Sequence, residues 1–298
     1  MIIYLFLIEC DMKKYILPLI IVILLFIIPL QFRKEALPKT VKECEISISI
    51  TFAESNEAMP LESYLVGVLA GEMPASFELE ALKAQAIAAR TYAIHQTNYG
   101  ATPIQQTTAH QVYKEELDPK YEKKLKQAVK ETKNQILTYN GRPITAMFHA
   151  ASNGQTETSE NFSGTQIDYL VAVSSPEEHT DIETFTLAQV NQALQGSFTL
   201  TQIAQAKITR NSTNRVETIT IGKRSWSGRE FRELLKLKST DFTITADSAV
   251  HIRTKGYGHG VGMSQHGAEA LATQGKSAEE IVGHYYPNTK LEQLACSK

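Results

Sequence analysis

The chain has 298 residues, 43% of them hydrophobic and 21% charged, and its 30 basic and 32 acidic side chains give a formal net charge of -2 at pH 7. This composition excludes a disordered chain, and the balanced charge argues against nucleic-acid binding. The three cysteines, Cys10, Cys44 and Cys296, contain no CxxC pair, which excludes a disulfide framework and a zinc-finger pattern.

The first notable segment is an uncharged apolar run, YILPLIIVILLFIIPL, at residues 15–30. It has no polar face, and no small-x-small cleavage site follows it, so an uncleaved membrane anchor is favoured over a removed signal peptide. We expect residues 1–34 to form this anchor, with Met12 as an alternative start of translation, and residues 35–44 to form a tether.

One N-terminal span before a large domain predicts a single-pass protein of the cell membrane, with the chain after about residue 35 outside the cytoplasm. The orientation rests on this topology, because basic residues flank the apolar run on both sides. In that compartment Cys44 and Cys296 could form a disulfide bond.

The remaining chain mixes helical and strand-like segments, without a repeat and without the strand-helix order of a doubly wound sheet. Its periodicity predicts helices at 61–72, 77–97 and 118–134, and strands at 45–52 and 136–139, the last followed by a turn at 140–143. We therefore predict an α+β fold, with a mixed α/β core domain and a smaller inserted α+β module. The predicted bounds are 45–180 and 249–298 for the core, and 181–248 for the module.

The first predicted helix, LESYLVGVLAGE at 61–72, places Glu72 in its apolar stripe and in its last turn, ahead of Pro74. Burial and the negative end of the helix dipole both favour the protonated carboxyl, so we expect a raised pKa. A general acid requires a carboxyl that stays neutral near pH 7. The alternative is a glutamate at a frayed helix end that points into solvent.

The second predicted helix carries Arg90 on its apolar face, with Ser76 as the expected N-cap. A buried guanidinium needs a carboxylate or a bound ligand, and Glu72 is a potential neighbour across the turn between the two helices. Because a tight pair would lower the pKa of Glu72, we expect Arg90 to orient substrate instead.

A polar loop at 148–160, FHAASNGQTETSE, combines an imidazole, hydroxyls and carboxylates, as hydrogen-bonding carbohydrate clefts do. Its candidate substrate-binding residues are His149, Ser152 and Glu157. The chain has no GxSxG nucleophile elbow, which argues against a serine hydrolase. A solvated loop without a binding role is the alternative.

A glycine-alternating run, GYGHGVGMSQHG, occupies residues 256–267. In an extended strand this alternation would strip one face of side chains, so a flat ligand or another backbone could lie against it. His259, Ser264 and Gln265 are its candidate substrate contacts. The histidines lack HExxH-type spacing, and we predict neither a metal site nor another cofactor.

Three segments resemble, in the same order, the stage II sporulation protein D (SpoIID) family of endospore-forming bacteria: LESYLVGVLAGEMPASFELEALKAQAIAARTYA, FHAASNGQTETSE and GYGHGVGMSQHGAEALATQGKSAEEIVGHYYPNT. The resemblance implies a membrane-anchored lytic transglycosylase of sporulation engulfment that cleaves peptidoglycan strands already stripped of their stem peptides. It also implies two partners, a peptidoglycan amidase and a membrane protein of the engulfment complex.

By the same resemblance, the family's catalytic glutamate in the EMP motif corresponds to Glu72 and its substrate-site arginine to Arg90. Two tyrosines that matter in the family correspond to Tyr169 and Tyr285. Some members carry zinc through central cysteines, and this chain has no cysteine there.

A single acid indicates a cleavage without water, since two-carboxylate glycosidases need a second Asp or Glu. We predict that Glu72 protonates the oxygen between N-acetylmuramic acid and N-acetylglucosamine and then takes the proton of the muramic C6 hydroxyl, which closes a 1,6-anhydro ring. Two alternatives stay open: a non-catalytic glycan-binding scaffold or amidase activator, and a true hydrolase.

Overall fold

In the computed structural model of the protein, the described residues are 49–294 without 54, 56, 106, 108 and 109. Two predictions, the anchor with its tether and the pairing of Cys44 with Cys296, lie outside these residues. Among the described residues, the structure has no helix of sufficient length and apolar character to cross a membrane.

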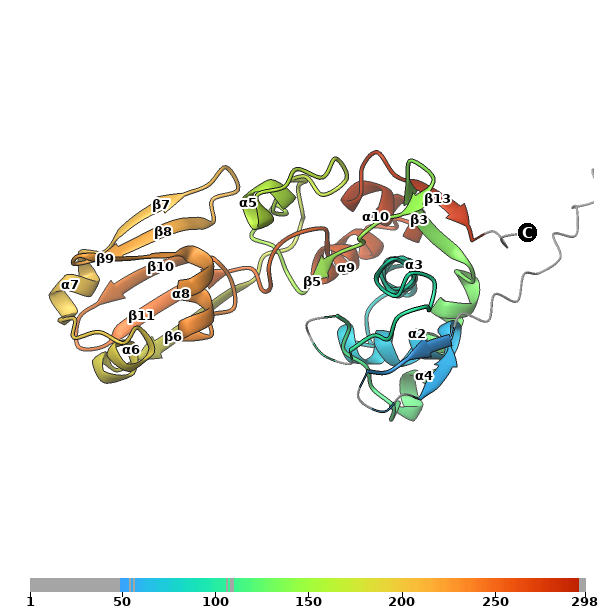
Figure 1. The fold of residues 1–298 in the computed structure, drawn as a ribbon, viewed down its shortest axis with the longest axis horizontal. Helices are drawn as coiled ribbons and strands as arrows, with labels where there is room; N and C mark the ends of the chain where they lie inside the picture. The colour runs from blue at the N-terminus through green and yellow to red at the C-terminus, as the bar shows by residue number, and fades with distance from the viewer. Residues whose placement is uncertain (1–48, 54, 56, 106, 108–109, 295–298) are drawn as a thin grey trace, which may run out of the picture. The chain divides into compact units, whose positions relative to one another are not determined.

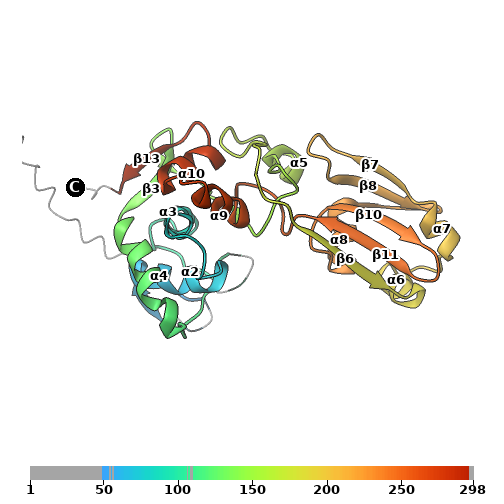
Figure 2. The ribbon, with the colours of Figure 1, turned by 180° about the vertical axis from the view of Figure 1, so that it is seen from behind.

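The core domain is built around one central helix, α3 (Leu79–Gln96). Both views place it between α9 (Gln265–Thr273) with α10 (Ala278–Tyr285) on one side and α2 (Leu61–Glu72) with α4 (Pro119–Glu131) on the other (Figure 1, Figure 2). Half of the buried residues of α3 are alanines, whose small side chains let neighbours approach from several directions.

Short strands complete the core domain. Strand β3 (Gln135–Tyr139) pairs antiparallel with β13 (Lys290–Gln293) and β4 (Arg142–Pro143), so the end of the chain returns to its middle. Strand β5 (Phe148–His149) runs parallel to β12 (Met263–Ser264), which brings the two predicted site segments side by side. Near the start, β1 (Ser49–Thr51) pairs with β2 (Ala58–Pro60), and α5 (Ser159–Ser163) follows the polar loop.

The inserted module has two three-stranded antiparallel sheets and its own hydrophobic core. The first sheet has the order β7-β8-β9 (Lys207–Arg210, Val216–Ile221, Arg224–Ser227). The second has the order β10-β11-β6 (Asp241–Ala246, Val250–Lys255, Thr180–Phe185). Three helices belong to the module: α6 (Leu187–Ala193), α7 (Leu200–Ala204) and α8 (Gly228–Leu235).

The α+β character matches the prediction, and two details differ. The predicted module boundary at 248 falls between β10 and β11, which are neighbouring strands of one sheet, so the module's sheet extends to Lys255. Helix α3 begins after Glu78, not after the predicted N-cap Ser76, and Glu269 Oε2 accepts a hydrogen bond from the Glu78 backbone N–H at 2.6 Å.

Candidate functional site

Glu72 is the last residue of α2, and the chain turns to an extended conformation at Met73. Its side chain is partly buried, and its Oε1 accepts a 2.6 Å hydrogen bond from the backbone N–H of Val112. Burial raises the pKa of Glu72, while hydrogen bonds from Val112 and from the Gln265 side chain lower it less. The net result is a carboxyl with a raised pKa, as expected from its place on the helix.

Two tyrosines share the surroundings of this carboxyl. The pKa of Tyr64 and that of Tyr92 are both raised, chiefly by burial and further by the negative charge of Glu72. The Tyr64 hydroxyl donates to Gln111 Oε1 at 3.0 Å, next to the segment that binds Glu72. Glu72 therefore stands in an aromatic, weakly polar environment, which favours its neutral form.

Glu72 lies in the wall of a cavity of about 790 Å³, a size typical of ligand-binding clefts. Four of the residues predicted as site residues line it: Glu72, His149, His259 and Gln265. The remaining lining residues come from six separate segments: Tyr92, His110, Val112, Met147, Phe148, Ala150, Phe162, Arg229, Arg232, Glu233, Tyr257 and Gly258.

Two of the histidines that line the cavity, His149 and His259, are held in the neutral form. Burial lowers the pKa of His149 well below its usual value, and burial together with Arg232 lowers the pKa of His259 to about 4. His149 Nδ1 lies 3.2 Å from the carbonyl oxygen of Val261, while its buried Nε2 has no hydrogen-bond partner among the described residues. A polar ligand in the cavity would give that nitrogen a partner.

The described part of the chain contains no group of three histidine, cysteine, aspartate or glutamate side chains arranged to hold a metal ion. The rings of His149 and His259 stand 5.7 Å apart, centroid to centroid. The pair therefore offers the cavity two neutral imidazoles, which can donate or accept hydrogen bonds.

The glycine run forms one wall of the cavity, but not as the predicted extended strand. All four alternating glycines have positive φ, a conformation that strains other residues. A Cβ on any of them would collide with a neighbour, and at Gly262 it would lie 1.9 Å from the carbonyl oxygen of Met147. The expectation that another backbone lies against the run is confirmed, because its neighbours include the backbone of residues 147–152.

Three further predicted residues, Ser152, Ser264 and Tyr285, do not line the cavity and instead belong to a buried network around Glu177. Glu177 Oε1 accepts hydrogen bonds from the Ser152 hydroxyl and from Ser264, and its Oε2 accepts from Ser175. The Tyr285 hydroxyl lies 2.6 Å from that of Ser175.

This network stabilises the position of one residue that lines the cavity, Gln265. Burial would raise the pKa of Glu177, but the hydrogen bonds from Ser175, Ser264 and Ser152 outweigh it and hold the pKa below its usual value. Ser264 is also the N-cap of α9, where its Oγ accepts the backbone N–H of Gly267 at 3.2 Å. Because α9 begins with Gln265, the charged Glu177 fixes the position of a side chain that contacts Glu72.

Glu157 lies where the core domain meets the module. Its buried carboxylate accepts hydrogen bonds from Asn161, Asn211 and Thr213, all between 2.8 and 2.9 Å. The Nε of Arg215 lies 3.9 Å from Glu157 Oε2. With these partners, Glu157 joins the module to the polar loop, and it lines a different cavity from the one that contains Glu72.

Arg90 is placed differently from the expectation that it orients substrate. It has no exposed surface, and both arms of its guanidinium bind Glu62, with Nε to Oε1 at 2.8 Å and Nη2 to Oε2 at 2.7 Å. Backbone carbonyls of Ala86, Val129 and Gln135 and the hydroxyl of Thr132 accept its remaining hydrogen bonds. The carboxylate that a buried arginine requires is therefore Glu62, and Glu72 stays unpaired with it.

Tyr169 also lies away from the cavity lining. Its hydroxyl accepts a 3.2 Å hydrogen bond from the backbone N–H of Thr145, and its ring packs 5.5 Å from that of Tyr139. In this position Tyr169 stabilises the segment that leads into β5, the strand that carries His149.

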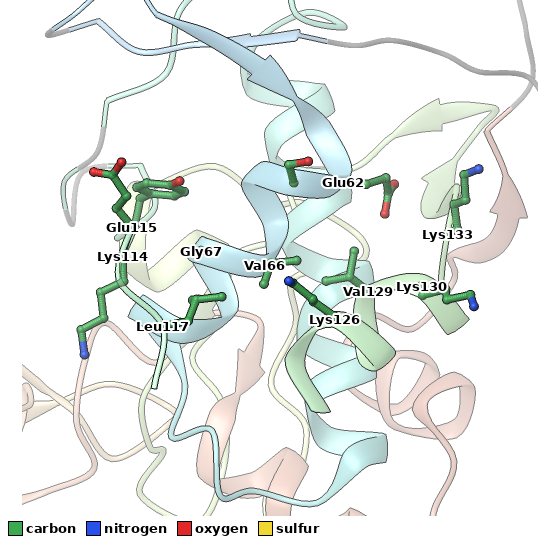
Figure 3. Close-up of a pocket in the computed structure, with 12 residues that line it drawn as sticks. Glu62, Val66, Gly67, Lys114, Glu115, Leu117, Lys126, Val129, Lys130 and Lys133 are labelled. Atoms are coloured by element: carbon green, nitrogen blue, oxygen red, sulfur yellow. The ribbon is translucent and has the colours of Figure 1, made fainter. Parts of the chain in front are cut away.

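A second cavity of about 500 Å³ lies between α2, α4 and residues 113–117, and Figure 3 shows Lys126 and Val129 on α4 across from Val66 on α2. Several lysines stand at its edge, namely Lys114, Lys126, Lys130 and Lys133. None of the predicted site residues lines it.

Sequence reasoning missed the cavity residues Tyr92, Arg229, Arg232 and Tyr257, as well as Glu177 behind it. Tyr92 lies on the same predicted helix as Arg90. No pattern in the sequence indicates that its side chain faces the cavity. The two arginines belong to α8 in the module, whose position over the cavity is set by long-range contacts.

Comparisons with known proteins indicate the same family as the three segments singled out by the sequence, and the family model covers the first of them. Residues 52–139 match the family model described as "SpoIID: Stage II sporulation protein". The chain is 39% identical over 281 residues to stage II sporulation protein D of Bacillus subtilis (strain 168), covering 86% of this chain and 81% of that protein. It is 38% identical over 282 residues to the protein of the same description from Bacillus amyloliquefaciens, covering 85% and 81%.

A further relative is described as an amidase enhancer of Bacillus subtilis (strain 168). The identity is 32% over 287 residues, and the match covers 76% of this chain and 40% of that protein.

Proposed function

Since the chain belongs to the stage II sporulation protein D family, a family involved in sporulation, we propose that it is a peptidoglycan lytic transglycosylase. Its substrate would be glycan strands whose stem peptides have been removed, and its products would end in 1,6-anhydro-N-acetylmuramic acid. We further propose that residues 1–34 anchor it in the cell membrane and that it works in engulfment with a peptidoglycan amidase and a membrane partner. The observation that carries the proposal is the raised pKa of Glu72 in the wall of the 790 Å³ cavity.

In the first half of the reaction Glu72 acts as a general acid. The neutral carboxyl donates its proton to the oxygen that links C1 of N-acetylmuramic acid to N-acetylglucosamine, and the C1–O bond breaks. Positive charge develops on the muramic ring as the bond breaks, and the carboxylate left on Glu72 stabilises it.

In the second half the same carboxylate acts as a general base. It takes the proton of the C6 hydroxyl of the same muramic acid, and the C6 oxygen attacks C1 to close the 1,6-anhydro ring. Glu72 is neutral again, one proton has left and one has returned, and no water is consumed.

A second carboxylate in the cavity wall, Glu233, raises the question of a two-carboxylate hydrolysis. Its Oε1 lies 3.4 Å from the Nε of Arg229, and its side chain is about two-thirds exposed at 65%. An exposed carboxylate of this kind is poorly placed to activate a single water on a bound sugar, since catalytic groups need fixed geometry. The lytic reaction therefore has better support than hydrolysis.

Neutral polar groups in the cavity suit an uncharged sugar backbone. His149, with its unpartnered Nε2, and His259 offer hydrogen bonds to hydroxyl and acetamido groups. The exposed ring of Tyr257 gives an apolar face on which a sugar ring can stack. Gln265 holds the reactive carboxyl through its side-chain hydrogen bond.

The test is product analysis on peptide-free glycan strands. The native protein should release 1,6-anhydro-ended sugars without incorporating oxygen from labelled water, and Glu72→Gln should reduce that release at least about 100-fold. The matched control is Glu279→Gln, an exposed glutamate in the first turn of α10. Unchanged release by Glu72→Gln would remove the assignment, and reducing ends labelled from water would establish hydrolysis.

The second candidate function is a non-catalytic glycan-binding scaffold or amidase activator, which the relative described as an amidase enhancer favours. Under that alternative the native protein releases no sugar products but increases the rate of a partner amidase. Glu72→Gln would then alter glycan affinity or amidase stimulation alone.

A further inference from the structure

The wall of the cavity formed by the module carries two arginines, Arg229 and Arg232, one turn apart on α8. Both line the same cavity as Glu72, which comes from the core domain. The module is held against the core near this point, since Gly258 donates its backbone N–H to the carbonyl of Lys238 at 2.9 Å. Two cationic groups therefore line the same cavity as the candidate acid.

Arg232 is a partly buried cation, and no carboxylate oxygen of the described residues lies within 4.0 Å of its nitrogens, although the charge of Glu233 is close enough to oppose the lowering of its pKa. Its Nε donates to the backbone carbonyl of Leu237 at 3.1 Å, which fixes the direction of the guanidinium. Burial lowers the pKa of Arg232, because a charged guanidinium is less well solvated there than in water. By contrast, Arg90, Arg210 and Arg215 all have a carboxylate within 4.0 Å.

Arg229 is positioned by an aromatic ring. Its guanidinium carbon lies 4.6 Å from the centroid of the Phe162 ring, another lining residue of the cavity. Its Nε also lies 3.4 Å from Glu233, so part of its charge is already balanced. Arg232 is thus the stronger anion-binding group of the two, with Arg229 as a second donor.

A planar guanidinium with free terminal nitrogens matches a carboxylate, which it can bind through two parallel hydrogen bonds. The hydroxyl and acetamido groups of a glycan strand are neutral. The lactyl group of N-acetylmuramic acid is different: an amide bond to the stem peptide leaves it uncharged, and hydrolysis of that bond turns it into a carboxylate.

We propose that Arg232, assisted by Arg229, forms a subsite that binds the free lactyl carboxylate of peptide-stripped N-acetylmuramic acid. The inference rests on the proposed function, because it takes the glycan strand as the ligand of the cavity. It assigns to the module the task of recognising the stripped strand, while the core domain supplies Glu72.

This subsite gives the order of two reactions a physical basis. An amide hydrolysis must act first: water is consumed, the bond between the lactyl carbonyl and the peptide nitrogen breaks, and a carboxylate and a free amine result. The negative charge made in that step is the feature that Arg232 binds. A strand that keeps its peptides lacks this charge and gains nothing from the subsite.

The experiment measures equilibrium binding by the full chain carrying Glu72→Gln, so that turnover does not consume the ligand. Two probes are compared: peptide-free glycan strands, and the same strands with their carboxylates chemically reduced to alcohols. We expect the carboxylate form to bind about 10-fold more tightly at low salt, and the difference to shrink at high salt. Adding Arg232→Gln should abolish the preference, while Arg232→Lys should keep part of it.

The control is Arg253→Gln, which removes a cation from the exposed face of β11 in the same module. It should leave the preference for carboxylate strands unchanged. Circular dichroism and thermal unfolding of each variant establish that it is folded, and Arg232→Lys keeps the test valid if Arg232→Gln is not.

Equal binding of the two probes, or an equal loss for both with Arg232→Gln, overturns the inference. The proposed function is tested separately with the native chain. Cleavage of both probes at equal rates would leave the function standing and remove the subsite. Preferential binding of carboxylate strands without any cleavage would leave the subsite standing and remove the proposed lytic function.

Discussion

The backbone N–H of Val112 donates a 2.6 Å hydrogen bond to Oε1 of Glu72, forty positions earlier in the chain. A side chain at the end of α2 is thereby tied to a segment that follows α3. The contact gives the carboxyl a fixed direction, and burial raises its pKa despite the hydrogen bond. A carboxyl with a fixed direction and a raised pKa suits the general-acid step of the proposed chemistry.

The raised pKa of Glu72 predicts that the native residue destabilises the fold at neutral pH. A folded-state pKa above the unfolded value stabilises the fold below the unfolded pKa, and this contribution is lost as pH rises through the folded pKa. Glu72→Gln, which stays neutral, should therefore increase the free energy of unfolding at pH 7 by an amount on the order of 1 kcal/mol. Urea unfolding from pH 4 to pH 8 measures it.

The difference between Glu72→Gln and the native protein should shrink toward pH 4, because most of the native carboxyl is then protonated in both the folded and the unfolded state. A variant that is less stable than the native protein at pH 7 would contradict the raised pKa.

Removing the hydrogen bond from Gln265 should raise the pKa of Glu72 further, because that bond favours the ionised form. With Gln265→Met, the alkaline limb of the rate of glycan cleavage should move to higher pH, since Glu72 stays protonated longer. Carbon NMR titration of the Glu72 carboxyl gives the same answer without catalysis. Gln274→Met, at the exposed end of α9, is the control. A limb that stays in place or moves down would contradict the assignment.

Two glycine substitutions can distinguish the destabilisation caused by the close approach of residues 147–152 from the destabilisation caused by a left-handed backbone conformation. Gly262 and Gly275 both have positive φ, but a Cβ at Gly262 would lie 1.9 Å from Met147 O, while one at Gly275 meets nothing within 4 Å. Gly275→Ala should cost about 1–2 kcal/mol, the price of a left-handed alanine. Gly262→Ala should cost more than about 3 kcal/mol, because the backbone must also move. Equal costs in urea unfolding would show that the collision is easily relieved.

The pair of Arg90 and Glu62 should be a major stabilising contact. Glu62→Gln leaves a guanidinium with no exposed surface without its charged partner, and we expect a loss of about 1.5–3 kcal/mol in unfolding free energy. The control is Glu122→Gln on α4, where the pair with Lys126 is exposed and should cost less than about 0.5 kcal/mol. A loss for Glu62→Gln no larger than that of the control would refute a structural role for the pair.

Local features of the fold were predictable because their signals lie within a few residues. The bounds 61–72 of α2 match the prediction, since the apolar period and Pro74 both act locally. The predicted turn at Asn140-Gly141 is present, with both residues at positive φ as a two-residue hairpin requires. Glu72 was found in the same way, from its position on one helix.

The rest of the site could not be read from local patterns. The sequence pattern of alternating glycines is compatible with an extended strand as well as with a left-handed backbone. The close packing of residues 147–152 against the run explains why its glycines have the left-handed conformation. Ser152, Ser264 and Tyr285 have the right chemistry for a binding site, but their hydrogen bonds turn inward to the group around Glu177.

The sequence by itself determined the helix that carries Glu72, the family, and the order of the polar segments, because each is encoded in contiguous residues. The tertiary structure decided which of those residues face the cavity, that Glu62 is the partner of Arg90, and that α8 of the module supplies Arg232. The physical reason is that a buried charge or an enclosed cavity depends on which distant segments pack together, and hydrogen bonds across long sequence separations leave no periodic trace in the chain.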